Sequence, residues 1–146
     1  KIVDDSYVCG LLHDMGQVIF ESAHPTLLKK FKETCNKKAL TTEMFEKLAS
    51  GVNHAQIGAE IAKKWNFPES IVVSIRYHHA PSDAPEEYQK LVAIIYIANM
   101  LCHYQEEIVE FYQFDIDILK LINITNKNQL DALSGKIMLA YQNSIK

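Results

Sequence analysis

A set of polar side chains that could hold a metal ion stands at or beside positions where hydrophobic spacing predicts burial: His13, Asp14, His54, His78 and His79. The first two close a predicted helix. His54 begins another, whose Ile57 and Ile61 face the core three and seven residues later, so its ring should point the same way. The paired histidines follow the apolar Ile75 by three and four residues. These five side chains are the candidates for chemistry.

A buried imidazole or carboxylate must be hydrogen-bonded, paired or metal-bound, because the loss of its water otherwise costs several kcal/mol. Histidine nitrogens and a carboxylate oxygen suit Fe, Mn, Zn or Ni, and ligands on separate helices can converge in the core of a bundle. The alternative is that each ring is only hydrogen-bonded to its neighbours in the core. The spacing leaves both interpretations open.

Other catalytic arrangements find little support in the sequence. Gly135-Lys136 lacks the glycine-rich run that would cradle a phosphate, and no G-x-S-x-G motif is present for an acyl-transfer serine. Cys9 and His13 are four residues apart on one predicted helical face. An apolar neighbourhood raises the pKa of a thiol, so we do not expect Cys9 to be a nucleophile.

Apolar residues recur at intervals of three and four along the chain, which predicts an all-α fold of about seven helices without a sheet. Asn53 and Gln56 have the spacing of a capping box, and Pro68 suits the first turn of the helix that follows. The inward faces should carry Trp65 on one helix and Ile94, Ile95, Ala98 and Leu101 on another. The expected helices cover residues 8–15 (ended by Gly16), 26–34, 42–49, 54–65, 68–77, 88–104, 116–122 and 128–141.

The composition bounds the class of protein. With 146 residues, 48% of them hydrophobic, and few Gly and Pro, the chain is expected to form a single domain over 1–146 rather than a disordered segment. Its formal net charge of −3 argues against sequence-independent nucleic-acid binding. No apolar run approaches the ~20 residues of a membrane span and no signal peptide is evident, so we expect a cytoplasmic protein. Three cysteines without C-x-x-C spacing indicate free thiols.

Two stretches carry a family resemblance: GLLHDMG at 10–16, and VNHAQIGAEIAKKWNFPESIVVSIRYHH at 52–79. They resemble the HDOD domain, a signalling branch of the HD superfamily of metal-dependent phosphohydrolases. The resemblance implies a helical bundle that holds one or two metal ions. It assigns the HD doublet to His13 and Asp14, the next core histidine to His54, and the paired histidines to His78 and His79.

The sequence departs from the catalytic members of that superfamily at several positions. Where the cyclic di-GMP phosphodiesterase branch has a lysine in an I-G-K stretch, this chain has Gln17, and no glycine-tyrosine-proline motif follows the paired histidines. The distant aspartate of the superfamily falls on Asn99, and an amide is a weaker ligand for a hard metal. No histidine lies within 1–12 to supply the upstream ligand.

We therefore expect an HDOD-type regulatory or protein-interaction module of bacterial signal transduction, not an enzyme. Its partner would be another protein or a flanking signalling domain, in an oligomeric state that the sequence leaves open. One alternative is a phosphohydrolase acting on a nucleotide or cyclic dinucleotide, with the five candidate ligands holding Fe, Mn or Zn. Another is a purely structural module without a metal. Because the chain begins at Lys1 close to the doublet, we also expect further N-terminal helices in the family fold, whose absence leaves apolar surface uncovered.

Overall fold

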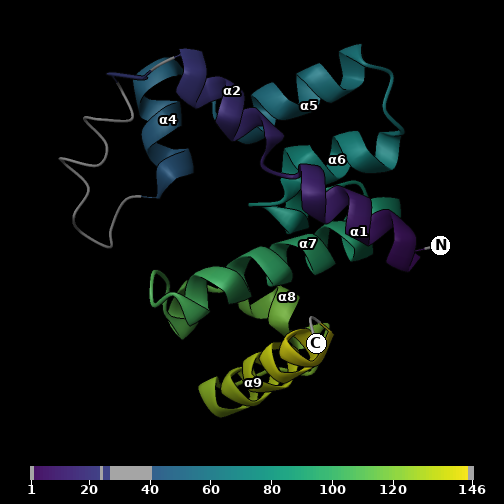
Figure 1. The fold of residues 1–146 in the computed structure, drawn as a ribbon, viewed down its shortest axis with the longest axis vertical. Helices are drawn as coiled ribbons and strands as arrows, with labels where there is room; N and C mark the ends of the chain where they lie inside the picture. Colours follow the sequence, from purple (N-terminus) through teal and green to yellow (C-terminus); the bar gives the residue numbers. More distant parts are fainter. Residues whose placement is uncertain (1, 24, 27–40, 145–146) are drawn as a thin grey trace. The chain divides into compact units, whose positions relative to one another are not determined.

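The computed structural model describes residues 2–23, 25–26 and 41–144, with regular structure that is helical throughout (Figure 1). Within these ranges there are eight α-helices, two short 3-10 helices and no strand, so the predicted all-α class is confirmed. The chain divides into two compact units, Lys1–Tyr96 and Ile97–Lys146, which are described separately. The expected single domain over 1–146 stays a prediction. The helix expected over 26–34 lies outside the described residues, apart from its first position.

The first unit contains all five candidate ligands. Helices α2 and α6 pack on α5, and α1 packs on α6, as Figure 1 shows. The helices of this unit are α1 (Ile2–Leu12), α2 (Met15–Ala23), α4 (Thr42–Ser50), α5 (His54–Lys64), α6 (Glu69–Tyr77), the 3-10 helix Pro81–Asp83 and the first part of α7 (Glu86–Gln105).

Local sequence signals set the ends of α4 and α5. Thr41 caps α4 by accepting a hydrogen bond from the backbone N–H of Met44, and Gly51 ends it with a left-handed φ of 81°. The predicted capping box of α5 is confirmed: Asn53 Oδ1 accepts from Gln56 N at 2.9 Å, and Gln56 Oε1 accepts from Asn53 N at 3.1 Å. These caps fix the residue at which α5 begins, which is His54.

Small side chains form the buried face of α5, contrary to the expected apolar stripe. Trp65 is 61% exposed, so its predicted inward position is wrong, and Ile57 and Ile61 are only partly buried. The core face instead carries Ala59 and Ala62, which pack with Val72 and Ile75 of α6. Alanines let the helix axes approach closely, and the larger side chains are displaced to the flanks. The predicted inward positions of Ile94 (41% exposed) and Ala98 on α7 are also wrong, whereas Ile95 is buried.

Gly16 serves close packing and does not end a helix as expected. Helix α1 ends at Leu12, a two-residue turn follows, and Gly16 lies inside α2. A Cβ atom at Gly16 would overlap the carbonyl oxygen of His54 and stand 2.6 Å from the backbone nitrogen of Gly58. Only a glycine permits α2 and α5 to lie this close, and this approach places the turn between α1 and α2 beside the start of α5.

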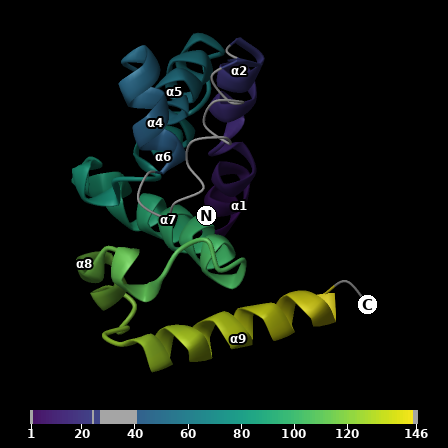
Figure 2. The same cartoon turned by 90° about the vertical axis from the view of Figure 1, so that its left-hand side faces the viewer.

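The second unit contains the rest of α7, the 3-10 helix Phe111–Gln113, α8 (Ile116–Lys120) and α9 (Lys127–Ser144), with α9 visible as a long helix in Figure 2. The Tyr104 hydroxyl donates to Asp131 Oδ1 at 2.5 Å, and Gln105 Nε2 donates to Ser134 Oγ at 3.0 Å. These bonds join α9 to the end of α7. Over the described residues, no helix combines the length and apolar character that crossing a membrane requires.

Apolar side chains remain exposed on the first two helices. Tyr7 is 70% exposed, Leu11 68% and Val18 67%. That helices of the family fold precede Lys1 stays a prediction.

We predict that Gly16→Ala lowers the free energy of unfolding by about 1–3 kcal/mol or more, because the new methyl group has no space beside α5. Urea unfolding measures the change. The matched control is Gly10→Ala on α1, where a Cβ would meet only Ile95 Cδ1 at 3.9 Å, an ordinary contact. This control should be unchanged or up to about 1 kcal/mol more stable. Equal stability of the two variants would contradict the close approach of α2 and α5.

Candidate metal centre

Four of the five candidate ligands converge in the first unit. They are Asp14 in the turn between α1 and α2, His54 at the start of α5, His78 at the C-terminal cap of α6, and His79 directly after it. One potential ligand atom from each lies within 4.8 Å of the others. We call these four side chains the donor cluster. All four are among the five candidates of the sequence analysis, and that they bind a metal stays a prediction.

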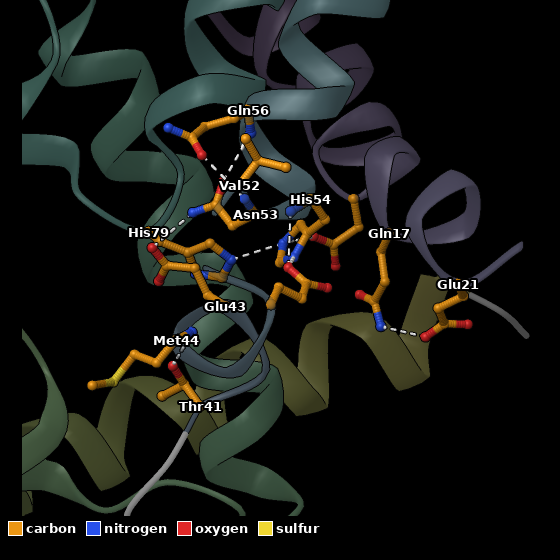
Figure 3. Close-up of polar contacts among 12 residues, drawn as sticks. Gln17, Glu21, Thr41, Glu43, Met44, Val52, Asn53, His54, Gln56 and His79 are labelled. Carbon is orange, nitrogen blue, oxygen red and sulfur yellow. Dashed lines mark hydrogen bonds and ion pairs between the residues drawn. The ribbon is translucent and has the colours of Figure 1, made fainter. Parts of the chain in front are cut away.

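The separations within the donor cluster suit a shared ion. His79 Nε2 lies 2.9 Å from His54 Nε2 (Figure 3), and Asp14 Oδ1 lies 3.2 Å from His78 Nε2 and 3.4 Å from His54 Nε2. Two ligand atoms that each lie about 2.1 Å from one ion are about 3.0 Å apart at a right angle and about 3.4 Å apart at a tetrahedral angle. These three spacings are close to the edges of a coordination shell.

Two buried atoms of the donor cluster lack hydrogen bonds. Asp14 Oδ1 and His78 Nε2 are both buried, and although they lie 3.2 Å apart they are not aligned for a hydrogen bond with any partner. An unsatisfied buried polar atom costs about 1–3 kcal/mol, more if the group is charged. A cation between these atoms would satisfy both, so the donor set fits a metal ion.

His13 lies beside the donor cluster and contacts one of its members. Its Nδ1 donates to the Gly10 carbonyl at 2.7 Å, its Nε2 lies 3.1 Å from Asp14 Oδ2, and its ring packs edge-on to that of His78 with centroids 5.0 Å apart. These contacts fix the orientation of the Asp14 carboxylate. That His13 is itself a metal ligand stays a prediction.

Glu46 is a site residue that the sequence analysis missed. It is only 2% exposed, and its Oε2 accepts hydrogen bonds from the backbone N–H of His54 at 2.8 Å and from His54 Nδ1 at 2.7 Å. No sequence signal marks it, because a glutamate between Phe45 and Lys47 is typical of the solvent face of a short helix. Its role depends on how α4 packs against α5.

In the absence of an ion, the members of the donor cluster shift one another's pKa values. Burial raises the pKa of Asp14, but the close approach of the His13, His54 and His78 rings to its carboxylate outweighs this and holds that pKa far below its usual range. Burial lowers the pKa of His54, but Asp14 and Glu46 outweigh it and raise the pKa to about 9. Burial, with the charges of His78 and His54, lowers the pKa of His79 to about 2. In the ion-free protein at neutral pH, a proton on His54 thus supplies positive charge between two carboxylates.

Two other residues singled out in the sequence are not members of the donor cluster. Asn99 falls in the second unit, so its alignment with the superfamily's distant aspartate stays a prediction. Cys9 is fully buried, its Sγ lies 3.8 Å from the Ser70 carbonyl oxygen, and burial raises the pKa of its thiol. The buried, protonated thiol agrees with the expectation that Cys9 is not a nucleophile.

The helical fold and the His/Asp cluster define an HD-type domain. Residues 1–81 match the HDOD domain, and this chain belongs to the HDOD family. The crystal structure of "Putative phosphohydrolase" from Shewanella amazonensis is similar, with a TM-score of 0.66 and 22% identity over 92% of this chain and 49% of that chain. This similarity shows that the two chains share the same fold.

A curated relative is an uncharacterized protein of Treponema pallidum (strain Nichols), which is 33% identical over 141 residues. The match covers 97% of this chain but only 28% of that protein. The chain thus spans less than a third of the length of this relative and about half of the similar solved structure.

We predict that the stability of the ion-free protein falls as the pH rises from about 6.5 to about 9. The pKa of His54 is raised from 6.5 to about 9 in the folded state, so its stabilisation is complete below pH 6.5 and is lost as the pH rises through the folded value. The slope is at most about 1.4 kcal/mol per pH unit. Urea unfolding in the presence of a chelator measures it.

His54→Gln is the control for this titration and should remove the slope, because the glutamine carries no titrating proton. A slope of the same size in this variant, or its absence in the wild-type protein, would contradict the assignment.

Proposed function

We propose that this chain is a metal-binding regulatory module of bacterial signal transduction that acts through protein contacts and not through hydrolysis. The convergence of one carboxylate and three imidazoles in the first unit carries the metal-binding part of the proposal. Membership of the HDOD family supports the regulatory part. The sequence also departs from catalytic HD members at positions used in phosphoester hydrolysis, where it has Gln17 in place of a lysine and Asn99 in place of an aspartate.

The ion would be held by the four side chains of the donor cluster. His13 contacts the Asp14 carboxylate, and Glu46 contacts the His54 ring at the nitrogen that does not face the cluster. A set of three imidazole nitrogens and one carboxylate oxygen suits Fe, Mn or Zn. In such a place the ion would supply positive charge and Lewis acidity.

The surroundings of Gln17 argue against phosphoester hydrolysis. The resemblance puts a phosphate-contacting lysine of the catalytic branch at this position. Here Gln17 Nε2 donates to Glu21 Oε1 at 3.0 Å, so a neutral amide is held beside a carboxylate (Figure 3). A carboxylate repels an approaching phosphate, whereas a lysine attracts it. The position that carries a phosphate-contacting lysine in the catalytic branch thus offers no positive charge here.

The proposed partner is another protein or a flanking signalling domain in the cytoplasm. The curated relative supports this because a chain of this length accounts for only 28% of it, which leaves room for other domains in that protein. The net charge of −3 disfavours nucleic acid as the partner. The exposed Tyr7, Leu11 and Val18 are apolar groups of the kind that protein contacts bury.

A metal-dependent phosphohydrolase is the second candidate function. The donor cluster favours it, and the similar structure from Shewanella amazonensis bears a phosphohydrolase name. The two functions predict the same metal content and differ in turnover.

We predict about one bound transition-metal ion per chain after growth or reconstitution with Fe, Mn or Zn, measured by plasma mass spectrometry. Asp14→Asn and His79→Ala should each lower the retained metal by at least about tenfold, because each removes a direct ligand. The control is His103→Ala, which removes a histidine of α7 that is not one of the candidate ligands and should keep the wild-type metal content. Circular dichroism checks that each variant is folded. Metal-free wild-type protein after reconstitution would refute the metal-binding part of the proposal.

We predict no turnover of bis-p-nitrophenyl phosphate above background with added Mn²⁺. The reason is that Gln17, which donates to the Glu21 carboxylate, offers no positive charge to the phosphate at the position where the catalytic branch has a lysine. Hydrolysis that Asp14→Ala abolishes would establish the phosphohydrolase instead.

A further inference from the structure

We propose that Glu46 is a positioning residue of the metal centre, which holds the His54 ring so that its Nε2 faces the donor cluster. This inference rests on the proposed metal binding and assigns a role to a residue outside the ligand set. It starts from an unusual burial, because glutamate is almost never fully buried unless it is paired. Glu46 is 2% exposed, and His54, to which it is bonded, is also 2% exposed.

One oxygen of Glu46 makes both of its described contacts with His54. Oε2 accepts from the backbone N–H at 2.8 Å and from ring Nδ1 at 2.7 Å. The first bond anchors the start of α5, where backbone N–H groups have no partner within the helix. The second bond acts on the ring. Together they fix both the backbone and the imidazole of His54 to one atom.

The ring contact determines which nitrogen is available to an ion. A carboxylate only accepts hydrogen bonds, so Nδ1 must carry the proton. A neutral ring then has its lone pair on Nε2, the atom that lies 2.9 Å from His79 Nε2 and 3.4 Å from Asp14 Oδ1. Hydrogen bonding at the far nitrogen of a ligand histidine commonly sets its tautomer and raises its basicity.

The other histidines show why His54 needs an acceptor from a different helix. His78 donates from Nδ1 to the carbonyl oxygen of Ile75, three residues earlier, and His13 donates likewise to that of Gly10. Both stand at the end of a helix and use its last turn. His54 is the first residue of α5 and has no preceding helical turn, so Glu46 of α4 takes the place of that carbonyl.

The charge of Glu46 also fits this role. A divalent ion held by three neutral imidazoles and Asp14 leaves one positive charge without a counter-charge. The Glu46 carboxylate is bonded to the opposite side of the His54 ring, and its negative charge balances this remaining positive charge. A buried ion is costly unless its charge is compensated, so this second carboxylate favours the occupied state.

The test compares Glu46→Gln, Glu46→Met and Asn53→Ala in the full chain. Glutamine keeps an acceptor oxygen but not the charge, whereas methionine keeps the volume but not the acceptor. Asn53→Ala is the matched control: it removes the α5 cap and the bond from Asn53 Nδ2 to Glu43 Oε1, a neighbouring link between α4 and α5 in Figure 3, and leaves the His54 ring contact in place.

Zn²⁺ affinity, measured by competition with a chelator well below the melting temperature, is the first readout. Glu46→Met should weaken binding by about 10- to 100-fold. Glu46→Gln should lose less than Glu46→Met, and Asn53→Ala should lie within about threefold of wild type. Similar losses in Asn53→Ala and Glu46→Met would show that Glu46 acts only by docking α4, which overturns the proposal.

The tautomer of His54 is the second readout and requires no metal. In ¹⁵N NMR spectra of the ion-free protein, taken at a pH where the ring is neutral, wild type and Glu46→Gln should show protonated Nδ1. Glu46→Met should show loss of that preference; an unchanged tautomer there would refute the role of Glu46. If wild type binds none of Zn²⁺, Mn²⁺ and Fe²⁺, the metal-binding part of the proposed function fails, and this measurement still decides the positioning role.

Discussion

The contact of α2 with α5 at Gly16 is the constraint on which the candidate site depends. The backbone of Gly16 lies against the carbonyl of His54 and against Gly58, at a distance that excludes any side chain. Asp14 precedes this contact by two residues and His54 forms part of it, so the packing of two helices directly sets the distance between a carboxylate and an imidazole. Helix packing and site geometry are thus one property of the fold, and a change in either alters the other.

The electrostatics of the site follow from the same convergence. Two carboxylates and three imidazoles lie close together, and the raised pKa of His54 keeps a proton on that ring in the ion-free protein. A metal ion that takes this place must displace the proton, because Nε2 needs a free lone pair to act as a ligand. The folded state is thus built around a positive charge that either a proton or a metal ion can supply.

Much of this arrangement could be predicted from the sequence, because helical periodicity and caps are local. The capping box of Asn53 and Gln56, the all-α class and the four members of the donor cluster were predicted. Features that depend on the distance between helices were missed: the packing role of Gly16, the exposure of Trp65 and the burial of Glu46. A glycine after a doublet is as compatible with a helix end as with a close crossing, and a glutamate on a short helix has no local sign of burial. Such features are properties of helix pairs, which a single sequence does not display.

The antiparallel pairing of α5 and α6 sets the register of the site (Figure 1). His54 opens the first helix and His78 closes the second, so the two rings meet at one end of the hairpin, with centroids 5.5 Å apart. One residue inserted within α5 would rotate the part of the helix that precedes it by about 100°. The His54 ring would then no longer point at the donor cluster. A residue inserted in the connecting turn at 65–68 would leave both helices in phase. In related chains the hairpin can therefore vary at its turn, whereas its arms can lengthen only by whole helical turns.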